Sequence, residues 1–352
     1  MSVPKFSLCA GSQQVHNTAS MSSPNAPAHP AYWLVVPTYN PGPQVWSRWL
    51  AALAQQSHPP QQVFVVDSSS TDGTPALSLA AGHQVLTVDA NQFNHGGTRQ
   101  WALNQALSQS QQQAPPPFVV YLTQDAVLAS PHAILQLLSS FQEPQVAAAF
   151  GRQMPNLQAP WLEAHARQYN YPSSSRTVSL QDKDTLGLKV CFFSDAFAAY
   201  RISSLQKQGG FPPHVPLGED TYVAGKLLLS GHSLRYEAAA AVYHSHQYNG
   251  LQDFQRMFDT GVFHAQNPWL LSSFGAAEGE GLRYTRSQLQ FLQAHHRSLD
   301  AVKGLVQVLY RNAVKWAGYR LGKAHAFLPL SLKRTFAMHK PFWAATSSHP
   351  QA

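Results

Sequence analysis

The chain has 352 residues, of which 44% are hydrophobic and 12% are charged, so a folded core is expected and global disorder is excluded. No apolar run approaches the ~20 residues of a membrane-spanning helix, which favours a protein kept in the cytoplasm. The net charge of +7 is uneven, because residues 297–340 hold nine Lys or Arg and one acid. This basic segment makes an anionic lipid surface or a nucleic acid its candidate partner.

The first part of the chain alternates between apolar strands and helices. Residues 1–30 come before this pattern, are rich in Ser, Pro, Asn and Ala, and are predicted to be disordered. Strands are expected at 32–40, 62–70, 84–90 and 118–126, and helices at 44–57, 76–82 and 96–110. This βαβαβαβ order predicts an α/β fold with a mostly parallel sheet that is covered on both faces.

After Phe150 the pattern is less regular. Residues 189–201 are typical of a strand entering a helix, and 209–231 of a Pro- and Gly-rich loop that leads into a helix. Residues 233–248 are typical of a last strand with histidines at its exit. We therefore expect a disordered segment at 1–30, an α/β domain at 31–250, and a helical, basic C-terminal extension at 251–352.

Acidic residues follow three of the predicted strands. Asp67, Asp89 and Asp125 each lie at or just past a strand end, and parallel sheets bind ligands at the carboxyl ends of their strands. A turn cap is the alternative for Asp67, and it is the favoured interpretation for Asp72, which Gly73 follows. Asp125 is suited to a hard cation such as Mg²⁺, with a helix N-cap as the alternative.

Two further pairs of polar residues lie downstream. Glu219 and Asp220 stand side by side at a helix start, where the helix dipole stabilises them or where one acts as a general base toward a hydroxyl. His244 and His246 occupy alternate positions of a strand and so face one side. They are interpreted as metal ligands or proton-handling groups, with packing or surface histidines as the alternative.

A glycine pair precedes a third helix. The segment "FNHGGTRQ" (93–100) places His95 and Arg99 around two glycines at the helix start. Glycines let a backbone approach a ligand closely, and an arginine pairs well with a phosphate. The sequence holds no G-x-G-x-x-G and no G-x-x-x-x-G-K-[ST], so neither dinucleotide binding nor P-loop chemistry is supported.

Eight motifs in one order make the sequence recognisable: "VVPTYN", "VVDSSSTDGT", "FNHGGTRQWALNQA", "TQDA", "DAFAAYR", "GGFP", "GED" and "HSH". Together they closely resemble glycosyltransferase family 2, and most of all its bacterial rhamnosyltransferase branch. The resemblance spans residues 33–248 and continues less specifically into "GEGLRY" and "MHKPFW". It implies that 31–250 is a catalytic domain with a GT-A fold, which takes a nucleotide-sugar donor and transfers the sugar by an inverting displacement.

The resemblance also implies roles for individual residues. Asp220 would be the base that deprotonates the acceptor hydroxyl, with Glu219 beside it. Asp125 would hold a divalent cation, Mg²⁺ or Mn²⁺, on the donor diphosphate, with His244 as a further ligand. Asp67 would contact the base or ribose of the donor. The residues implied to bind the donor are Pro37, Thr38, Tyr39, Asp67, His95, Arg99 and Gln124.

The chain departs from the family's pattern in three places, one of which is Gln100, where relatives often have Asn. The usual D-x-D metal motif is Thr123-Gln124-Asp125, so one carboxylate is missing and the need for a metal is open. Asp195 stands where Asn or Ser is commoner, and it either touches the acceptor or is structural. His246 is assigned, with Asp195, to the acceptor side.

The resemblance implies transfer of L-rhamnose from dTDP-L-rhamnose to a hydroxyl of a growing cell-surface glycan, such as a lipid-linked O-antigen. A UDP-hexose donor on the same fold, or a non-catalytic nucleotide-sugar-binding protein, are the alternatives. The basic, aromatic tail either rests on anionic lipid at the inner face of the cytoplasmic membrane or caps the catalytic domain. No nucleic-acid partner is expected, because no RNA-binding motif is present.

Overall fold

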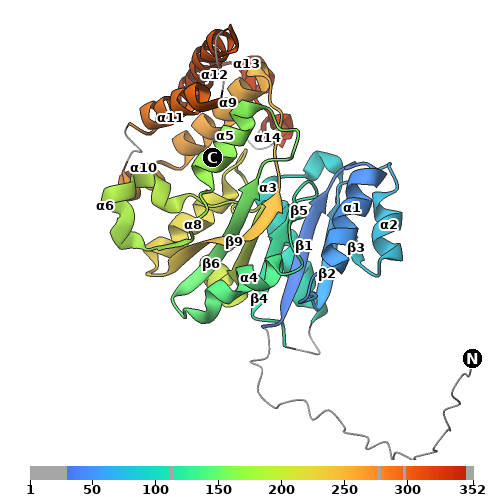
Figure 1. The fold of residues 1–352 in the computed structure, drawn as a ribbon. Coiled ribbons are helices and arrows are strands. Elements are labelled where there is room, and N and C mark those ends of the chain that lie inside the picture. The colour runs from blue at the N-terminus through green and yellow to red at the C-terminus, as the bar shows by residue number, and fades with distance from the viewer. Residues whose placement is uncertain (1–29, 111–113, 276–278, 296–298, 346–352) are drawn as a thin grey trace, which may run out of the picture.

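The computed structural model describes residues 30–110, 114–275, 279–295 and 299–345. The predicted disorder at 1–30 therefore lies outside the described residues, except for Pro30. A twisted sheet runs through the body of the molecule, helices cover it, and the C-terminal helices gather at one end (Figure 1). The α/β class expected from the sequence is confirmed.

The sheet has nine strands within the described residues, in the order β3-β2-β1-β4-β8-β6-β9-β5, with β7 paired to β9. The strands are β1 (Tyr32–Thr38), β2 (Gln62–Asp67), β3 (Gln84–Thr87), β4 (Phe118–Leu122), β5 (Val127–Leu128), β6 (Val146–Met154), β7 (Arg176–Val178), β8 (Phe197–Arg201) and β9 (Ser233–Tyr243). The half formed by β3, β2, β1 and β4 is parallel throughout. In the other half, β8 lies antiparallel between β4 and β6, while β9 pairs in parallel with β6.

Parallel pairing is predicted from the strand–helix alternation, and it is found where that alternation holds. Beyond β4 the chain reaches β8 through an irregular stretch rather than through a single crossover helix. The whole sheet is therefore mixed, and β4, the last strand of the regular alternation, lies between a parallel and an antiparallel neighbour.

Helices cover both faces of the parallel half, which explains why its strands are apolar at every position. In β1, Leu34 packs with Trp46 on one face, and the next residue, Val35, packs with Leu103 on the other. The helices up to the last strand are α1 (Pro43–Ala54), α2 (Thr74–Ala80), α3 (His95–Gln109), α4 (Ala133–Ser139), α5 (Trp161–Asn170), α6 (Lys183–Leu186), α7 (Ile202–Lys207) and α8 (Glu219–Leu229).

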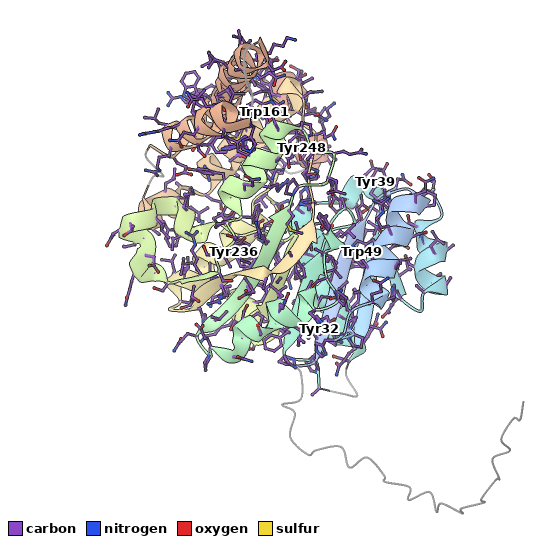
Figure 2. All side chains as sticks on the ribbon, viewed as in Figure 1. Tyr32, Tyr39, Trp49, Trp161, Tyr236 and Tyr248 are labelled. Carbon is purple, nitrogen blue, oxygen red and sulfur yellow. The ribbon has the colours of Figure 1, made fainter. Side chains whose placement is uncertain are left out.

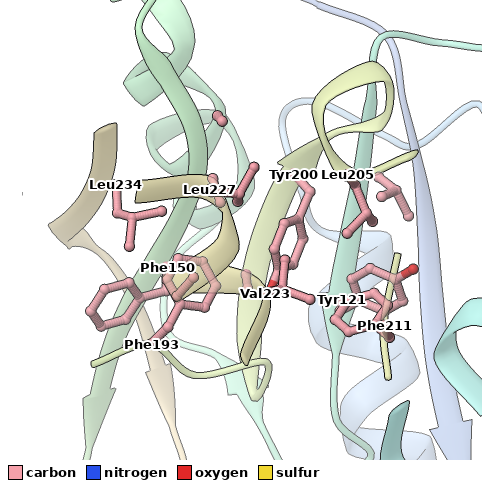
Figure 3. Packing of buried hydrophobic residues seen from close by; sticks show 14 of the residues in the cluster. Tyr121, Phe150, Phe193, Tyr200, Leu205, Phe211, Val223, Leu227 and Leu234 are labelled. Atoms are coloured by element: carbon pink, nitrogen blue, oxygen red, sulfur yellow. The ribbon is translucent and has the colours of Figure 1, made fainter. Parts of the chain in front are cut away.

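A group of aromatic rings fixes the approach to α8. Tyr121 of β4, Tyr200 of β8 and Phe211 of the preceding loop meet edge to face, with centroids 5.2–5.9 Å apart (Figure 3). Such edge-to-face contacts add to the stabilisation that comes from the area the rings bury. The loop is thereby held against the sheet, and the first residues of α8 start at a defined place above β4 and β8.

The C-terminal helices share the main core with the sheet. They are α9 (Gly250–Gln266), α10 (Pro268–Phe274), α11 (Glu280–His295), α12 (Leu299–Lys323), α13 (Leu330–Phe336) and α14 (Lys340–Ala345). Phe263, Leu270 and Phe274 belong to the same buried cluster as β1 and β4. The boundary at 250 stays a prediction, and the apolar packing crosses it.

The helices α9 and α12 pack backbone against backbone. A Cβ atom added at Gly318 would lie 2.3 Å from the carbonyl oxygen of Phe254, and one at Gly322 would lie 2.0 Å from that of Phe258. Only glycine allows this approach, so the contact fixes α12 on α9. In the described part of the chain, no helix combines the length and the apolar character needed to span a bilayer.

Candidate functional site

The loops that leave β1 and β2 are joined by hydrogen bonds. Thr38 and Asp67 are register partners at the carboxyl ends of the two strands, and the Thr38 hydroxyl donates to Asp67 Oδ1 at 2.8 Å. The backbone N–H of Ser70 donates to Asp67 Oδ2 at 2.8 Å. Asp67 is 1% exposed, so the structure gives it a role in fixing these loops. Its contact with a donor stays a prediction.

Gln124 continues the pairing of β1 and β4 beyond the strand ends. Its side-chain oxygen accepts from the Tyr39 N–H at 2.7 Å, and its amide donates to the Tyr39 carbonyl at 3.2 Å. The Tyr39 side chain itself is exposed at the tip of this loop (Figure 2). The carboxyl ends of β1, β2 and β4 thus bring together the predicted donor residues Pro37, Thr38, Tyr39, Asp67 and Gln124.

Asp72 and Asp89 have local roles. Asp72 accepts from the backbone N–H of Gly42 at 2.6 Å, and from the N–H and hydroxyl of Thr74. The capping role expected for Asp72 is confirmed. Asp89 accepts from the Asn91 N–H at 2.8 Å and caps a short turn in the same way.

Asp125 forms a cluster with the two histidines that follow β9. His244 Nε2 lies 3.3 Å and His246 Nδ1 lies 3.7 Å from Asp125 Oδ2. The ligand atoms of the three side chains all lie within 4.8 Å of one another. His246, expected on the acceptor side, is therefore also part of the candidate metal site.

A buried glutamine orients His244. The Gln153 amide donates to the Ser194 hydroxyl at 2.7 Å, and its oxygen accepts from Arg167. An arginine can only donate, so this amide orientation is fixed, and the 2.8 Å contact of His244 Nδ1 with the same oxygen must be a donation from the ring. The lone pair of a neutral His244 then lies on Nε2 and points at Asp125, as a metal ligand requires.

The cluster is suited to a divalent cation. A neutral His244 and an ionised Asp125 present two acceptor atoms to each other at 3.3 Å, which is unfavourable unless a proton or a metal ion lies between them. Burial lowers the pKa of His246 to about 4, so this ring is neutral. Burial opposes ionisation of Asp125, but a proton held between His244 Nε2 and the carboxylate outweighs burial and holds the pKa of Asp125 well below its usual range. One carboxylate and two neutral imidazoles form a common transition-metal ligand set.

Arg99 lies in a second, more deeply buried cluster. Its Nη1 is 2.9 Å from Glu219 Oε1 and its Nε is 3.4 Å from Asp195 Oδ2. It also donates to the His95 carbonyl at 2.8 Å, and only 4% of the residue is exposed. Tyr200 donates to the other Asp195 oxygen at 2.6 Å. These contacts favour the structural alternative for Asp195 and a positioning role for Arg99.

The three neighbouring acids differ in protonation. Burial would raise the pKa of Glu219, but Arg99 and His95 outweigh it and hold that pKa below its usual value. Burial raises the pKa of Asp195 to about 8, against the effect of Arg99. Burial and the charge of Glu219 raise the pKa of Asp220 to about 6. Glu219 therefore carries the negative charge that pairs with Arg99, and Asp220 titrates just below neutral pH.

The first turn of α8 separates Glu219 from Asp220. Gly218 has φ +86°, which favours glycine, and a Cβ there would lie 2.9 Å from the Phe263 ring. From this start Glu219 points inward and is 5% exposed. Both acids line a cavity of about 360 Å³. Glu219 pairs there with Arg99, whereas Asp220 receives the N–H of Thr221 at 2.6 Å and has no ion-pair partner among the described residues. Of the two predicted catalytic acids, Asp220 has the geometry of a base.

His95 lines the cavity beside Asp220 and packs against the C-terminal tail. Burial lowers the pKa of His95 to about 4, and its ring lies 5.3 Å from that of His339. The backbone N–H groups of Met338 and His339 donate to buried Asp259 at 3.0 and 2.9 Å. The "MHKPFW" segment, to which the resemblance extends less specifically, is therefore anchored on Asp259 of α9 and packs against His95.

The Asp220 cavity adjoins a larger one of about 890 Å³ that contains His244 and His246 in its wall. The two share Tyr171, Phe192, Ser194, Arg256 and Thr260. Asp220 and the two histidines that contact Asp125 thus line adjoining cavities. Asp67 lies at the neighbouring strand ends and lines neither of these cavities.

Arg256 of α9 is a residue that the sequence reasoning missed. It lines both cavities, and the only polar or ring partner of its guanidinium among the described residues is the Tyr248 ring, 6.0 Å away. Asp253, Arg256 and Thr260 follow one another at helical spacing and all line the larger cavity. This line of polar residues on an amphipathic helix was the sequence signal that could have indicated Arg256 as a site residue. Figure 2 shows Tyr248 near the C-terminal helices.

Comparison with known proteins identifies the family and the fold. Residues 33–209 match the family Glycosyl transferase family 2. The chain is 42% identical to the O-antigen chain rhamnosyltransferase WbaN of Salmonella anatum, over 89% of this chain and 96% of the relative. It is also 42% identical to RfbN, of the same description, from Salmonella typhimurium, over 88% and 95%.

Among solved structures, a mannosyltransferase from Pyrobaculum calidifontis in complex with GDP-Man and Mn²⁺ superposes with a TM-score of 0.53 at 19% identity, over 93% of this chain and 88% of that one. This likeness confirms the GT-A fold that the resemblance implied. Together with the family match and the two relatives, it shows that this chain is a glycosyltransferase and belongs to glycosyl transferase family 2.

Proposed function

We propose that this protein transfers L-rhamnose from dTDP-L-rhamnose to a hydroxyl of a growing O-antigen glycan. The observation that carries the proposal is the 42% identity to two O-antigen chain rhamnosyltransferases over nearly their whole length. The connected cavities support it, because they bring a free carboxylate, a candidate cation site and an unpaired arginine to one space.

Asp220 acts as the general base. As the acceptor oxygen attacks the anomeric carbon of the donor sugar, its proton passes to the Asp220 carboxylate. The bond between the anomeric carbon and the diphosphate oxygen breaks with its electron pair, so the nucleoside diphosphate leaves as an anion and the anomeric configuration inverts. A pKa near 6 suits this role, since Asp220 is ionised at neutral pH and still accepts a proton.

The buried cluster beneath Asp220 holds the base in place. Arg99 joins the start of α3 to the start of α8 through Glu219, and it approaches Asp195 ahead of β8. The Arg99–Glu219 ion pair and the contact with Asp195 lie away from water and are therefore rigid. We assign Glu219, Arg99 and Asp195 as positioning residues rather than as groups that touch the substrate.

Asp125, His244 and His246 would hold a divalent cation. When bound, this cation neutralises charge on the donor diphosphate. The two imidazoles favour Mn²⁺ over Mg²⁺, which prefers oxygen ligands. Gln153 keeps Nε2 of His244 free to coordinate. The single acid of Thr123-Gln124-Asp125 is thus supplemented by histidines from the other half of the sheet.

Arg256 takes the role first expected of Arg99. Its guanidinium lies between the base and the histidine cluster and has no carboxylate partner among the described residues. A preorganised cation in a cavity stabilises the charge that develops on the leaving diphosphate. On the donor side, we propose that Pro37, Thr38, Tyr39, Asp67 and Gln124 shape the nucleoside pocket.

A donor and acceptor assay tests the function. The purified protein is incubated with Mn²⁺, an O-antigen acceptor, and either dTDP-L-rhamnose or a UDP-hexose, and the released nucleotide and the product are measured. Release of dTDP with a rhamnosylated product is expected. Release of UDP alone would replace the donor assignment, and donor binding without transfer would favour a non-catalytic protein.

A further inference from the structure

The longest helix of the molecule has an apolar face that no other part of the described chain covers. On α12 the residues Val302, Val306, Leu309 and Trp316 are 58–68% exposed. Ala313 and Arg320 continue the same line at intervals of three or four residues, so the line runs along one face of the helix. It spans roughly 27 Å at 1.5 Å per residue.

This face is fixed in position because the opposite face is locked. Gly304, Val308, Gly318 and Gly322 are buried and recur at the same helical spacing on the other side of α12. The close backbone contacts of Gly318 and Gly322 with α9 prevent the helix from rolling. The apolar face therefore remains on the outside of the molecule, where Figure 1 shows α12 as the outermost helix.

The charge around this face is positive beyond the first turn of α12, which carries the exposed Asp300. After Asp300 the remaining sequence contains no acid. Lys303, Arg320 and Lys323 on α12 are exposed. Just past the helix, Phe327 is 91% exposed, and Leu330 and Leu332 are exposed as well. An apolar strip whose charged neighbours beyond the first turn are cations complements an anionic bilayer, in which the apolar side chains enter the acyl region and the cations meet the headgroups.

The same helix also forms a wall of the reaction space. Trp316 lines the 890 Å³ cavity, and Tyr310 lines an adjoining cavity of about 520 Å³. Both side chains are also exposed, at 68% and 55%. The edge of the apolar face therefore coincides with the edge of the cavities that hold the histidine cluster.

We propose that α12, with residues 302–332, docks on an anionic membrane surface and directs the mouth of the cavities toward it, so that a lipid-linked acceptor enters from the bilayer. The docking is independent of the chemistry, whereas the identity of the acceptor rests on the proposed glycosyl transfer.

Vesicle co-sedimentation tests the docking. The full-length protein is mixed with vesicles of phosphatidylethanolamine and phosphatidylglycerol, or of phosphatidylcholine alone, over a salt series. Binding to the anionic vesicles that weakens in high salt is expected. The double variant Val306→Asp/Leu309→Asp should lower the vesicle partition coefficient at least tenfold. Leu79→Asp is the matched control, since Leu79 is 61% exposed on α2 and should bind as wild type.

Charge-reversal variants test the contribution of the lysines in the same co-sedimentation experiment. Lys303→Glu/Lys323→Glu should weaken binding by about fivefold for each reversed lysine, whereas Arg48→Glu/Lys207→Glu, elsewhere on the surface, should change it little. Thermal unfolding confirms that each variant is folded. Equal binding by the α12 variants and their controls, or indifference to lipid charge, would overturn the proposal, as would a wild-type dimer that the apolar double variant dissociates.

Two acceptors distinguish delivery of the acceptor from the membrane from the proposed glycosyl transfer itself. Wild type should act both on a water-soluble acceptor analogue and on a lipid-linked acceptor in anionic vesicles. Val306→Asp/Leu309→Asp should retain the first activity and lose at least tenfold of the second. No activity of wild type on either acceptor contradicts the proposed function alone, while equal loss on both acceptors contradicts delivery from the membrane.

Discussion

Two sets of polar residues lie next to each other in this protein, and their charges are satisfied in different ways. In the buried cluster, Arg99 is enclosed by Glu219 and Asp195, and all three are at most 5% exposed. Around the cavities, Arg256 and Asp220 face open space and have no ion-pair partner among the described residues. Charged groups that pair with one another fix the geometry of the site. Charged groups without an ion-pair partner are available to bind substrate.

The largest effect is expected at the base. Asp220→Asn keeps the shape of the side chain but removes proton acceptance, so kcat/KM should fall by about 10³-fold. The unfolding free energy and donor binding should change little, which thermal shift with dTDP-L-rhamnose measures. Glu219→Gln serves as the comparison, because it should act mainly on stability. Transfer that survives Asp220→Asn would show that another group accepts the proton.

The same substitution at Arg99 and at Arg256 should distinguish a structural role from a role in the reaction. Arg99→Leu leaves the charge of Glu219 buried without its cation, so the unfolding free energy should drop by about 3–5 kcal/mol. Urea unfolding measures this. Arg256→Leu breaks no ion pair among the described residues, and its change should stay within about 1 kcal/mol. Equal destabilisation by both would remove the distinction between the two sets.

Arg256→Leu should lower activity strongly although it changes stability little. In the folded variant Arg256→Leu, kcat/KM should fall by about 10²-fold, because a preorganised cation at the leaving group is lost. Arg256→Lys keeps the charge and should recover part of that loss. Steady-state kinetics at saturating Mn²⁺ measures both variants. Wild-type activity in Arg256→Leu would return the diphosphate role to another residue.

A smaller effect is expected at the residue behind the histidine cluster. Gln153→Leu removes the acceptor for His244 Nδ1, so the ring loses its fixed orientation. Mn²⁺ affinity should fall by about 10–100-fold, as calorimetric titration measures without any turnover. Asp125→Asn is the positive control, since it removes a ligand. Unchanged affinity in both variants would argue against a metal at this cluster.

The pH dependence should be the mildest change. With a pKa raised to about 6, Asp220 loses its proton as the pH rises, so kcat/KM should climb about tenfold per unit below pH 6 and level off above it. Burial and the charge of Glu219 raise the pKa of Asp220, while Arg99 and the backbone N–H groups of Thr221 and Asp195 lower it. Asp220→Asn should give a flat profile at its low rate. An unchanged slope in that variant would assign the titration elsewhere.

The sequence predicted the parallel half of the sheet well. The strand–helix alternation up to β4 specifies a parallel sheet, so the expectation that Asp67, Asp89 and Asp125 lie at the carboxyl ends of its strands follows from local patterns. The Asp72 cap is equally local. The antiparallel position of β8 was not predicted, because nothing in 189–201 indicates which strand will be its neighbour.

The contacts that define the roles were harder to predict. Arg99 and Glu219 are 120 positions apart in sequence, and only the packing of α3 against α8 brings them together. Gln153 and Arg256 come from elements without a motif of their own. Their roles arise from where the C-terminal helices pack, which single-sequence periodicity does not determine.

The paired glycines of α12 carry a consequence for how such enzymes diversify. Because Gly318 and Gly322 fix the helix through main-chain atoms, its outward side chains can be exchanged without moving the base or the histidines. Substrate preference and lipid preference are then free to drift during evolution while the reaction chemistry is inherited unchanged.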